Sequence, residues 1–474
     1  MKKTFNIKTL AAIVALFLVS LSASAQFSGG NGTENNPYII TTPAQLAQLA
    51  TLVNEGNTDY NDKHYKLGNE LDLSEYGEGF NGGAGWIPIG QVEIEFYDKR
   101  DLIFNPFKGV FDGDNHIIYN LHINIINLNP DCYSIISVGL FGSIENGIIK
   151  NLGVVDVNIS LPVIPIDLQI YTGAIVGLNF NSNISNCFST GVVYASADFF
   201  NSSTTREPIK IGILGGIVGR NSGSISNCYS TCDIYSEYDY LAFAGGIVGE
   251  NSGDVFKCYS TSDINSKASF GVLGGVVGFN TGTVSSCGAL NPRISFLDYE
   301  DNSYIPFGRV VGINSGLIAN NIAFKNMLNH SDNTTWSNIG SDDIDGEDIS
   351  SQIIWSDGTL GGRFTTQNGW TTQNGKLPGL FGQTVDMPEH LILTGISNNP
   401  FSQNLTAFVQ NGDLYISGLI LDEKWYIYSI SGIMIYEDIA ISNTVETRNA
   451  LSQQLPTGIY IIKSGTKTTT IIIK

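Results

Sequence analysis

Four stretches of this chain repeat almost letter for letter, and this internal repeat limits the possible folds more than any other feature. The four copies are Gly215–Gly223, Gly245–Gly253, Gly274–Gly282 and Gly308–Gly316. Each copy starts with glycine, passes through a Val-Gly pair, and ends in Asn-Ser-Gly or Asn-Thr-Gly. A repeated unit of this size indicates a fold that grows by stacking, in which each copy buries its apolar face against its neighbours.

The Val-Gly glycine of each copy serves as a marker, and weaker equivalents precede it. The markers are Gly113, Gly142, Gly177, Gly219, Gly249, Gly278 and Gly312, separated by steps of 29, 35, 42, 30, 29 and 34 residues. The minimum step is nearly constant while the excess varies, which indicates insertions in a constant unit. The insertions fall at residues 161–171, 195–210, 237–241 and 291–307, at one phase of the repeat. We therefore expect them to crowd onto one side of the stack, where binding often occurs.

The residues that follow each marker alternate as in a strand with one buried face. After Gly219, the inward set is Cys228, Ser230, Cys232 and Ile234, and the outward set is Asn227, Tyr229, Thr231 and Asp233. The composition, with 53 Gly and 14% charged residues, is typical of a β-rich, turn-rich chain. Strands stacked in parallel about 4.8 Å apart would hide a continuous core. The predicted fold class is all-β, a parallel β-helix or solenoid.

Stacking places equivalent residues of successive coils above one another, which predicts two columns of side chains. Asparagines two positions after the markers are expected to include an amide ladder: Asn115, Asn179, Asn221, Asn251, Asn280 and Asn314. Cys187, Cys228, Cys258 and Cys287 lie nine or ten residues after their markers and should form one internal column. We interpret them as buried thiols. A disulfide between neighbouring coils is the alternative in an oxidising compartment, although parallel Cβ vectors disfavour it.

The two ends of the chain differ from the repeat. Residues 1–25 have the pattern of a signal peptide, with Lys2 and Lys3, an apolar stretch and Ala23-Ser24-Ala25, so cleavage is expected between Ala25 and Gln26. Residues 43–55 predict an amphipathic helix, capped by Thr42, that would cover the first sheet edge. We expect a solenoid over residues 26–390, with repeat units at about 105–324 and a closing cap at 325–390. Residues 391–474 predict a small antiparallel β-sandwich.

Charge and hydropathy exclude some partners. The chain has 24 basic and 44 acidic residues, a formal net charge of −20, which disfavours nucleic acid. Solubility outside the cell explains this balance, and weak calcium binding is the alternative. No segment after residue 25 reaches the length of an apolar membrane span, so no transmembrane segment is expected.

The repeat resembles a known bacterial family. Gly-Gly-Ile-Val-Gly, Asn-Ser-Gly and Asn-Cys-Tyr-Ser-Thr in residues 215–231 resemble the GLUG motif of bacterial surface β-helical proteins. Residues 107–121 look like an opening unit of the same kind. The resemblance covers roughly residues 30–390 and implies a β-helical protein at the cell surface.

The tail resembles the C-terminal sorting domain of type IX secretion in Bacteroidetes. The match is carried by Ile427–Gly432, Leu455–Ile462 and the final Ile-Ile-Ile-Lys474, with Asn399-Pro400 at the usual opening. It implies Sec-dependent passage across the inner membrane, export by the type IX secretion machinery, and cleavage of the tail or attachment to the surface.

Candidate catalytic groups are few, and no catalytic, cofactor-binding or metal-binding residue is predicted. The five His residues form no His-Glu-x-x-His, which argues against a metallopeptidase. Asp112 and Asp114 flank Gly113, and Asp233 and Asp263 are expected on neighbouring coils, where they could act as paired carboxylates or lie solvated on the surface. Residues 341–346 only partly match a calcium loop, since the first acid is missing and Gln352 stands where Glu should close it.

Phe188, Tyr229 and Tyr259 predict an outward aromatic column. It could stack on sugar rings as a ligand surface, or simply pack between coils. The favoured reading is an exported, adhesin-like surface protein that binds glycans or extracellular proteins and has no enzymatic activity. The alternatives are a polysaccharide lyase or glycoside hydrolase of the β-helix type, and a passive structural protein of the cell surface.

Overall fold

The computed structural model describes residues 26–95, 102–124, 134–161, 168–197, 210–238, 241–267, 270–296 and 306–392, together with seven strands between 406 and 473 and residues 419 and 433. The chain divides into two compact units, Met1–Leu391 and Ile392–Lys474. The division falls beside residue 390, where the sequence changes character. The expected signal peptide and its cleavage site at Ala25 fall outside the described residues, apart from Gln26.

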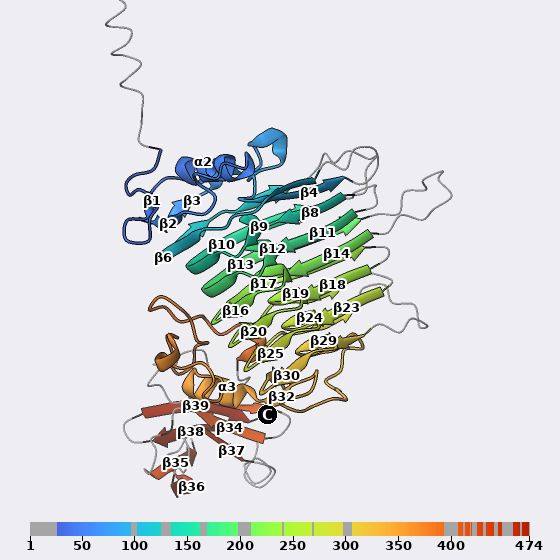
Figure 1. Ribbon diagram of the computed structural model, residues 1–474. Helices are drawn as coiled ribbons and strands as arrows, with labels where there is room; N and C mark the ends of the chain where they lie inside the picture. The colour runs from blue at the N-terminus through green and yellow to red at the C-terminus, as the bar shows by residue number, and fades with distance from the viewer. Residues whose placement is uncertain are drawn as a thin grey trace, which may run out of the picture. The chain divides into compact units, whose positions relative to one another are not determined.

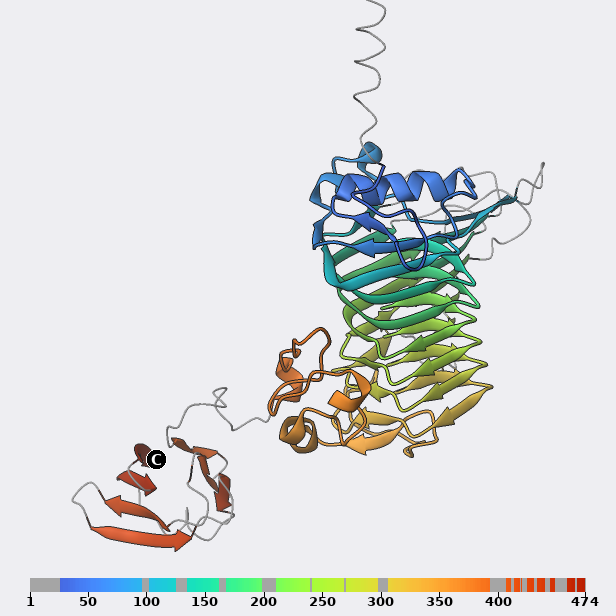
Figure 2. The same cartoon turned by 60° about the vertical axis from the view of Figure 1, so that its left-hand side comes forward.

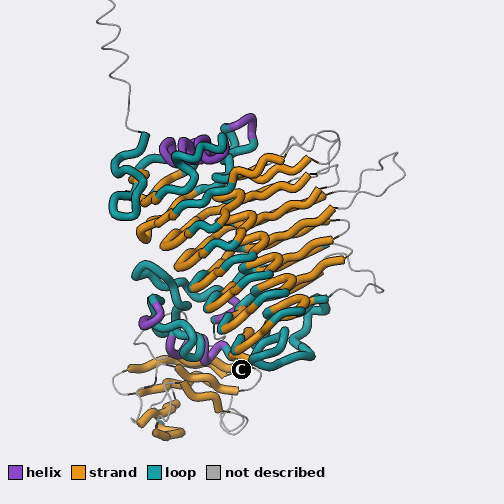
Figure 3. Tube along the Cα trace, viewed as in Figure 1, coloured by secondary structure: helices purple, strands orange, loops and turns teal. Residues whose placement is uncertain are grey.

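The first unit is a parallel β-solenoid built from three sheets, which we call long, eight-stranded and six-stranded (Figure 1). Figure 3 shows the strands following one another coil after coil, joined by short turns. One complete coil contains β14 (Lys210–Gly215), β15 (Val218–Asn221), β16 (Ser224–Ser226) and β17 (Tyr229–Tyr238). Val218 pairs with Val248 and Ile234 with Ile264 in the next coil, so equivalent residues lie directly above one another. The predicted parallel solenoid is confirmed.

The remaining strands of the solenoid have these bounds. The eight-stranded sheet adds β4 (Gln91–Glu95), β5 (Leu102–Asn105), β8 (Ser134–Val138), β11 (Leu168–Gly173), β18 (Leu241–Gly245), β23 (Phe270–Gly274) and β28 (Phe307–Gly308). The six-stranded sheet adds β9 (Phe141–Glu145), β12 (Val176–Phe180), β19 (Val248–Asn251), β24 (Val277–Asn280) and β29 (Val311–Asn314). The long sheet adds β1 (Tyr38–Ile40), β2 (His64–Leu67), β3 (Leu71–Asp72), β6 (Val110–Tyr119), β7 (His122–Asn124), β10 (Ile148–Leu161), β13 (Asn183–Ala197), β20 (Asp254–Phe256), β21 (Tyr259–Ser260), β22 (Ile264–Ser266), β25 (Thr283–Ser285), β26 (Gly288–Ala289), β27 (Ile294–Phe296), β30 (Leu317–Ala319), β31 (Ile322–Phe324) and β32 (Glu347–Ile349).

Glycine is required at these repeat positions because backbone segments approach one another closely at one corner of the coil. A Cβ on Gly215 would lie 1.9 Å from the carbonyl oxygen of Val218, and one on Gly216 would lie 2.2 Å from that of Gly246. The marker Gly219 is equally confined, since its Cβ would lie 2.6 Å from the backbone nitrogen of Thr172. The motif therefore allows two strands to meet with no side chain between them.

The marker series is correct from Gly142 onward and wrong at Gly113. Phe141 bridges to Ile89, and a Cβ on Gly142 would lie 2.3 Å from the carbonyl oxygen of Gly90, so Gly90 is the residue stacked on Gly142. Gly113 belongs to β6 in the long sheet, against Asn151 and the Cα of Leu152. The spacing of 29 residues from Gly113 to Gly142 resembles a repeat step. The first coils are irregular, however, so this spacing alone predicts the wrong position in the coil for Gly113.

The asparagine ladder forms over five residues. Each amide donates to the next along Asn179, Asn221, Asn251, Asn280 and Asn314, at 2.6, 2.8, 2.8 and 2.7 Å. Each side chain from Asn221 to Asn314 also bonds the backbone of the glycine two residues later, which fixes the turn. Asn115 was expected in this ladder but has no place in it, because it follows the misassigned Gly113.

The interior column of cysteines is also present. Cys187, Cys228, Cys258 and Cys287 are fully buried on successive coils, and each thiol donates to the carbonyl oxygen two residues earlier. All five cysteines of the described residues are free thiols. The inward set of Cys228, Ser230, Cys232 and Ile234 is buried as predicted.

A helix closes the N-terminal end of the solenoid. Helix α2 (Pro43–Asn54) lies over the first coils (Figure 1), and the hydroxyl of Thr42 accepts the backbone N–H of Gln45 as its cap. Leu46, Leu49 and Val53 form its buried face. The predicted capping helix is confirmed, and it covers a sheet edge that would otherwise be open to another strand.

Short helical segments occur at both ends of this unit. They are α3 (Ser351–Asp357), η1 (Ser74–Tyr76), η2 (Asn81–Gly83), η3 (Thr366–Asn368) and η4 (Glu389–Leu391).

The second unit consists of two small antiparallel sheets. One contains β33 (Thr406–Gln410), β34 (Asp413–Ser417) and β37 (Thr444–Thr447). The other contains β35 (Lys424–Ser429), β36 (Met434–Ile439), β38 (Gly458–Ser464) and β39 (Lys467–Ile473). Leu414 and Ile416 from the first sheet share one apolar cluster with Trp425, Ile427 and Ile462 from the second. The predicted sandwich architecture is thereby confirmed.

Candidate functional site

The strand ends that flank the insertions of the repeat lie along one edge of the solenoid. Six segments outside the described residues each join the end of a strand in the long sheet to the start of one in the eight-stranded sheet. They are residues 125–133, 162–167, 198–209, 239–240, 268–269 and 297–305. Their anchor points are stacked, since Ala197 pairs with Tyr238 and Leu241 with Phe270. The predicted alignment of the insertion points is confirmed, and two further segments, at 125–133 and 268–269, share the same edge.

The aromatic column is present as a stack of parallel rings. The centroids of Phe188 and Tyr229 are 4.9 Å apart with 1° between the ring planes, and those of Tyr229 and Tyr259 are 5.2 Å apart with 8°. In such a stack the ring faces are turned toward one another. Both faces of Tyr229, and the faces of Phe188 and Tyr259 that are turned toward it, are therefore closed to a stacking sugar.

A later segment of the chain covers the edges of this column. Residues 358–391, which we call the strap, run back against the flank of the solenoid (orange in Figure 2). Phe381 of the strap packs on Phe188, and Trp370 packs on both tyrosines. Phe188 and Tyr229 keep 8% and 6% of their surface exposed, and Tyr259 keeps none. The expectation of an open sugar-stacking surface at these three residues is therefore corrected: they pack between coils and under the strap.

Asp233 and Asp263 lie on neighbouring coils, as expected. The backbone N–H of Asp263 donates to Oδ1 of Asp233 at 2.9 Å. Burial, followed by the adjacent charge of Asp263, raises the pKa of Asp233 above its ordinary value, although the backbone hydrogen bond opposes this. His390 of the strap lies close enough to sense the charge of Asp263, but its Nε2 bonds the carbonyl oxygen of Leu290 at 2.7 Å. The carboxylate of Asp233 thus joins two coils, whereas Asp263 contributes its backbone N–H, and its own Oδ1 is buried without a hydrogen bond among the described contacts.

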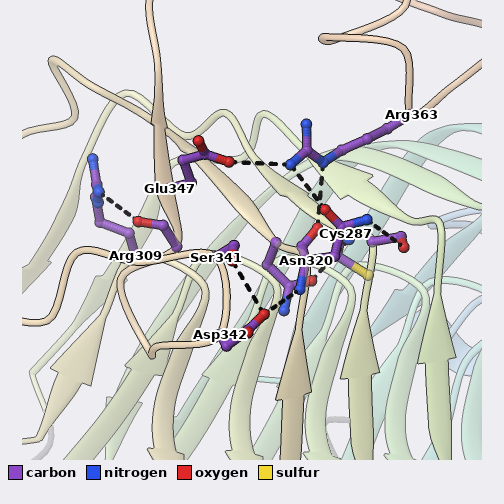
Figure 4. Close-up of polar contacts among 10 residues, drawn as sticks. Cys287, Arg309, Asn320, Ser341, Asp342, Glu347 and Arg363 are labelled. Atoms are coloured by element: carbon purple, nitrogen blue, oxygen red, sulfur yellow. Dashed lines mark hydrogen bonds and ion pairs between the residues drawn. The ribbon is translucent and has the colours of Figure 1, made fainter.

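The C-terminal end of the solenoid is closed by a polar cluster (Figure 4). Arg309 occupies the position that is Gly216, Gly246 and Gly275 in the three preceding coils. Its side chain is fully buried, and its guanidinium contacts Asp348 at 2.8 Å and the carbonyl oxygens of Asp345 and Gly346. The segment stacked on this last repeat copy is residues 344–346, whose carbonyl oxygens accept from the Arg309 guanidinium and from the backbone N–H groups of Val310 and Val311. Arg309 therefore bonds the closing segment at the position where the three earlier copies have glycine.

The acidic turn at residues 341–346 belongs to this closure. Oδ1 of Asp345 accepts the backbone N–H of Arg309, and Oδ2 accepts that of Asn338. Asp342 accepts the backbone N–H of Asn320, a residue that Arg363 also contacts (Figure 4). The carboxylates of Asp342 and Asp345 thus accept hydrogen bonds from the protein itself, in agreement with an acidic turn. Within the described residues, no group of three His, Cys, Asp or Glu side chains has the arrangement of a metal site.

Comparison with known proteins gives the repeat its family context. Residues 169–194 and 212–235 match the model of the GLUG motif. A protein named "Putative Gly-rich membrane protein" from Evansella cellulosilytica is 31% identical over 189 residues, covering 38% of this chain and 18% of that protein. Halomucin from Haloquadratum walsbyi is 29% identical over 165 residues, covering 35% of this chain and 2% of Halomucin. The chain thus spans less than a fifth of either relative.

One solved structure shares the architecture over most of its length. A Bacteroides ovatus protein named "putative immunoglobulin A1 protease" superposes with a TM-score of 0.53 at 20% sequence identity, covering 76% of this chain and 97% of that one. At this identity the likeness concerns the fold alone. The chain is a parallel β-helical protein that carries GLUG motifs. Among the residues that the structure describes, no helix is long and apolar enough to cross a membrane.

Proposed function

We propose that this chain is an exported surface protein that acts by binding, with the aligned insertions of its solenoid as the adhesin-like contact surface. The observation that carries the proposal is the shared edge of the six insertions. Repeated strands supply a rigid scaffold, and segments of variable length at one phase supply the variable chemistry. The ligands proposed are glycans or extracellular proteins.

Export would use both ends of the chain. In this proposal residues 1–25 are a signal peptide cleaved between Ala25 and Gln26, and residues 391–474 are a type IX sorting domain. The resemblance of the tail supports this route, as does the separation of the second unit as a sandwich with its own apolar cluster. Deleting residues 391–474 should leave the protein in the periplasm of a type IX-competent host. Surface labelling of the truncated protein would contradict the assignment.

The binding role is tested by changing one insertion at a time. The chain from Gln26 is incubated with an array of glycans and extracellular matrix proteins. One variant has residues 198–209 replaced by Asp-Tyr, the dipeptide that joins β17 to β18 in the next coil at positions 239–240. A matched control replaces the same residues by a Gly/Ser segment of equal length. We expect both variants to keep the melting temperature of the solenoid and to lose ligand.

The same incubation distinguishes binding from catalysis. Released oligosaccharide would favour the lyase or hydrolase alternative, and cleaved immunoglobulin A1 would favour an activity like that in the name of the Bacteroides ovatus protein. Retention of every array ligand after all six insertions are replaced would overturn the binding surface. Failure to retain any ligand at all would favour the passive structural alternative.

A further inference from the structure

Part of the last coil of the solenoid has no strand stacked on it within the residues that the structure describes. The segment that closes this end bonds the coil at two places: the backbone N–H of Val311 donates to Ile344, and that of Asn321 donates to Ser341. The closing segment goes directly from Ser341 to Ile344, so it bypasses residues 312–319. These residues, which we call the open edge, contain most of β29 and all of β30 (Figure 1). As far as the chain is described, the two strands pair on one side alone, with β24 and β25.

The open edge is more exposed than the equivalent residues of earlier coils. Asn221, Asn251 and Asn280 are fully buried, whereas Asn314 is partly exposed. Leu317 keeps 60% of its surface exposed. An exposed sheet edge presents unpaired backbone groups, which can bond a strand from another chain.

Two carbonyl oxygens of the open edge lack the backbone donors that their equivalents have. In earlier coils, the carbonyl of the ladder asparagine accepts the backbone N–H that follows the asparagine of the next coil. The carbonyl of the repeat glycine accepts the N–H that follows the next glycine. These bonds run from Ser252 to Asn221, Thr281 to Asn251, Ser315 to Asn280, Asp254 to Gly223, Thr283 to Gly253 and Leu317 to Gly282, at 2.7 or 2.8 Å. Asn314 and Gly316 are next in the two series, and in the described contacts no backbone N–H of a following coil donates to them.

The side chain of Asn314 ends its ladder with an unused donor. In Asn221, Asn251 and Asn280, Nδ2 donates both to the next asparagine and to the glycine of its own turn. Nδ2 of Asn314 donates only to the carbonyl oxygen of Gly316, at 3.0 Å, among the described contacts. A side-chain amide carries two hydrogens. One therefore remains for an acceptor stacked on the open edge.

The repeat glycines restrict what can stack there. A Cβ on Gly253 would lie 2.0 Å from the carbonyl oxygen of Gly223, and one on Gly282 or Gly316 would lie equally close to the glycine of the preceding coil. A strand added to the open edge would meet the carbonyl oxygen of Gly316 in the same way, so it needs glycine at that position. It also needs a side-chain acceptor two residues earlier, above Asn314, and asparagine supplies that acceptor throughout the ladder.

We propose that the open edge binds an extended segment of another polypeptide that carries the repeat's own turn, Asn-Ser-Gly or Asn-Thr-Gly. The segment would continue the parallel stack. Its backbone N–H groups would bond the carbonyls of Asn314 and Gly316, and its asparagine would accept from Nδ2 of Asn314.

A second copy of this chain is not the proposed partner. The sequence has four turns of this kind, at residues 221–223, 251–253, 280–282 and 314–316. The first three are stacked between coils, and the fourth is the open edge itself. A folded second copy therefore offers no free turn. The proposed surface is independent of the insertions and goes beyond the binding function above.

The experiment uses the peptide Gly278–Ser285, which carries one turn and no charged residue. The peptide has blocked ends and a fluorophore, and its anisotropy is measured while the chain from Gln26 is titrated in. We expect saturable binding. The peptide variants Gly282→Ala and Asn280→Ala should bind roughly tenfold more weakly or worse, because one introduces a clash and the other removes a ladder hydrogen bond. The matched control is Thr283→Ala, which should bind as the parent peptide does, because this position differs from coil to coil.

The site of binding is tested on the chain itself. Asn314→Asp keeps an acceptor for Asn280 but removes the donor of the open edge, and should weaken the peptide by a similar factor. A melting curve shows whether this variant is folded, and the peptide variants decide the question independently of it. A photoreactive benzophenone on Phe279 of the peptide should crosslink within residues 312–319. The chain lacking insertion 198–209 should bind the peptide unchanged, so the open edge and the insertion surface succeed or fail separately.

Several results would overturn the proposal. They are absence of saturable binding, equal binding of the peptide with Gly282→Ala, or crosslinks outside the open edge. Sedimentation of the chain provides a further check. A dimer that the peptide dissociates would assign the open edge to a second copy and contradict the proposed partner.

Discussion

Tyr259 donates its phenolic hydroxyl to the carbonyl oxygen of Pro378, 119 residues later in the chain, at 2.6 Å. The tyrosine is fully buried, and burial, assisted by Tyr229, raises its pKa well above the ordinary value. This hydrogen bond ties the strap to the middle of the solenoid. Together with the rings of Trp370 and Phe381, it holds the strap over an aromatic column that faces outward from its sheet, so this column is buried.

The strap contact predicts a specific loss of stability. Tyr259→Phe keeps the stacked ring but leaves the Pro378 carbonyl without this donor, and should lower the free energy of unfolding by about 1–2 kcal/mol. Proteolysis within residues 358–391 should become faster. Tyr229→Phe is the control, because its hydroxyl makes no hydrogen bond among the described contacts, and it should change stability little. Equal destabilisation by both variants would show that the Pro378 bond is unimportant.

The polar cluster around Arg309 predicts a larger loss of stability than the one expected for Tyr259→Phe. Arg309→Ala removes a fully buried cation and leaves Asp348 and three carbonyl oxygens without this partner, so the free energy of unfolding should fall by roughly 3–5 kcal/mol. Arg293→Ala breaks an exposed pair with Asp332, in which the side chains are 40% and 70% exposed, and should cost at most about 1 kcal/mol. Urea unfolding measures both. Similar losses in the two variants would mean that Arg309 does not close the end.

The asparagine ladder predicts that the stability lost on substitution is larger for a residue inside the ladder than for one at its end. Asn251→Ala removes hydrogen bonds to the ladder neighbours on both sides and to the Gly253 turn, and should cost roughly 3 kcal/mol. Asn314→Ala removes one ladder bond and the bond to its own turn at Gly316, so a smaller loss of roughly 2 kcal/mol is expected. Chemical denaturation of the two variants tests the order. A larger loss at Asn314 than at Asn251 would contradict a ladder that stabilises from both sides.

The strap also predicts a pH dependence through His390. Burial lowers the pKa of His390 below its ordinary value of 6.5, while the hydrogen bond to Leu290 and the charge of Asp263 oppose this shift. The unfolded chain then binds this proton more readily than the folded chain does. Stability should therefore fall as the pH drops from about 6.5 toward the lowered pKa. In His390→Gln, the amide can still donate to Leu290, and the slope in that window should become smaller. Denaturation midpoints measured between pH 7.5 and 5 decide this, and identical slopes in the two proteins would exclude His390 as the cause.

The interior thiols predict chemical inertness. The five cysteines of the described residues are fully buried, which keeps a reagent away from them. Burial also raises the pKa of Cys232 to about 11, so its reactive thiolate is scarce. In a Cys132→Ser variant, which removes the one cysteine outside the described residues, a thiol reagent should label almost nothing until denaturant is added. Rapid labelling of the folded protein, or a count below five free thiols after unfolding, would contradict a reduced and buried column.

The repeating part of this protein can be predicted from its amino-acid pattern alone. Strand alternation decides that Cys228 points inward and Tyr229 outward, because successive side chains of a strand point to opposite faces. In-register stacking then carries Asn221 onto Asn251 and Cys228 onto Cys258, because each pair is separated by one period of 30 residues. Strand geometry and a constant repeat length are sufficient to predict these columns of stacked residues.

The features that break the period depend on contacts that form only when the chain has folded. Gly113 was misassigned because the first coils have their own irregular lengths, and the same irregularity hid the meeting of Lys66 with Asp112 and Lys150. The strap covers Tyr259 because apolar rings on the flank gain free energy when Trp370 and Phe381 remove them from water. Such contacts join segments with no common period, so their partners are set by the way the folded surfaces fit, which spacing along the chain does not encode.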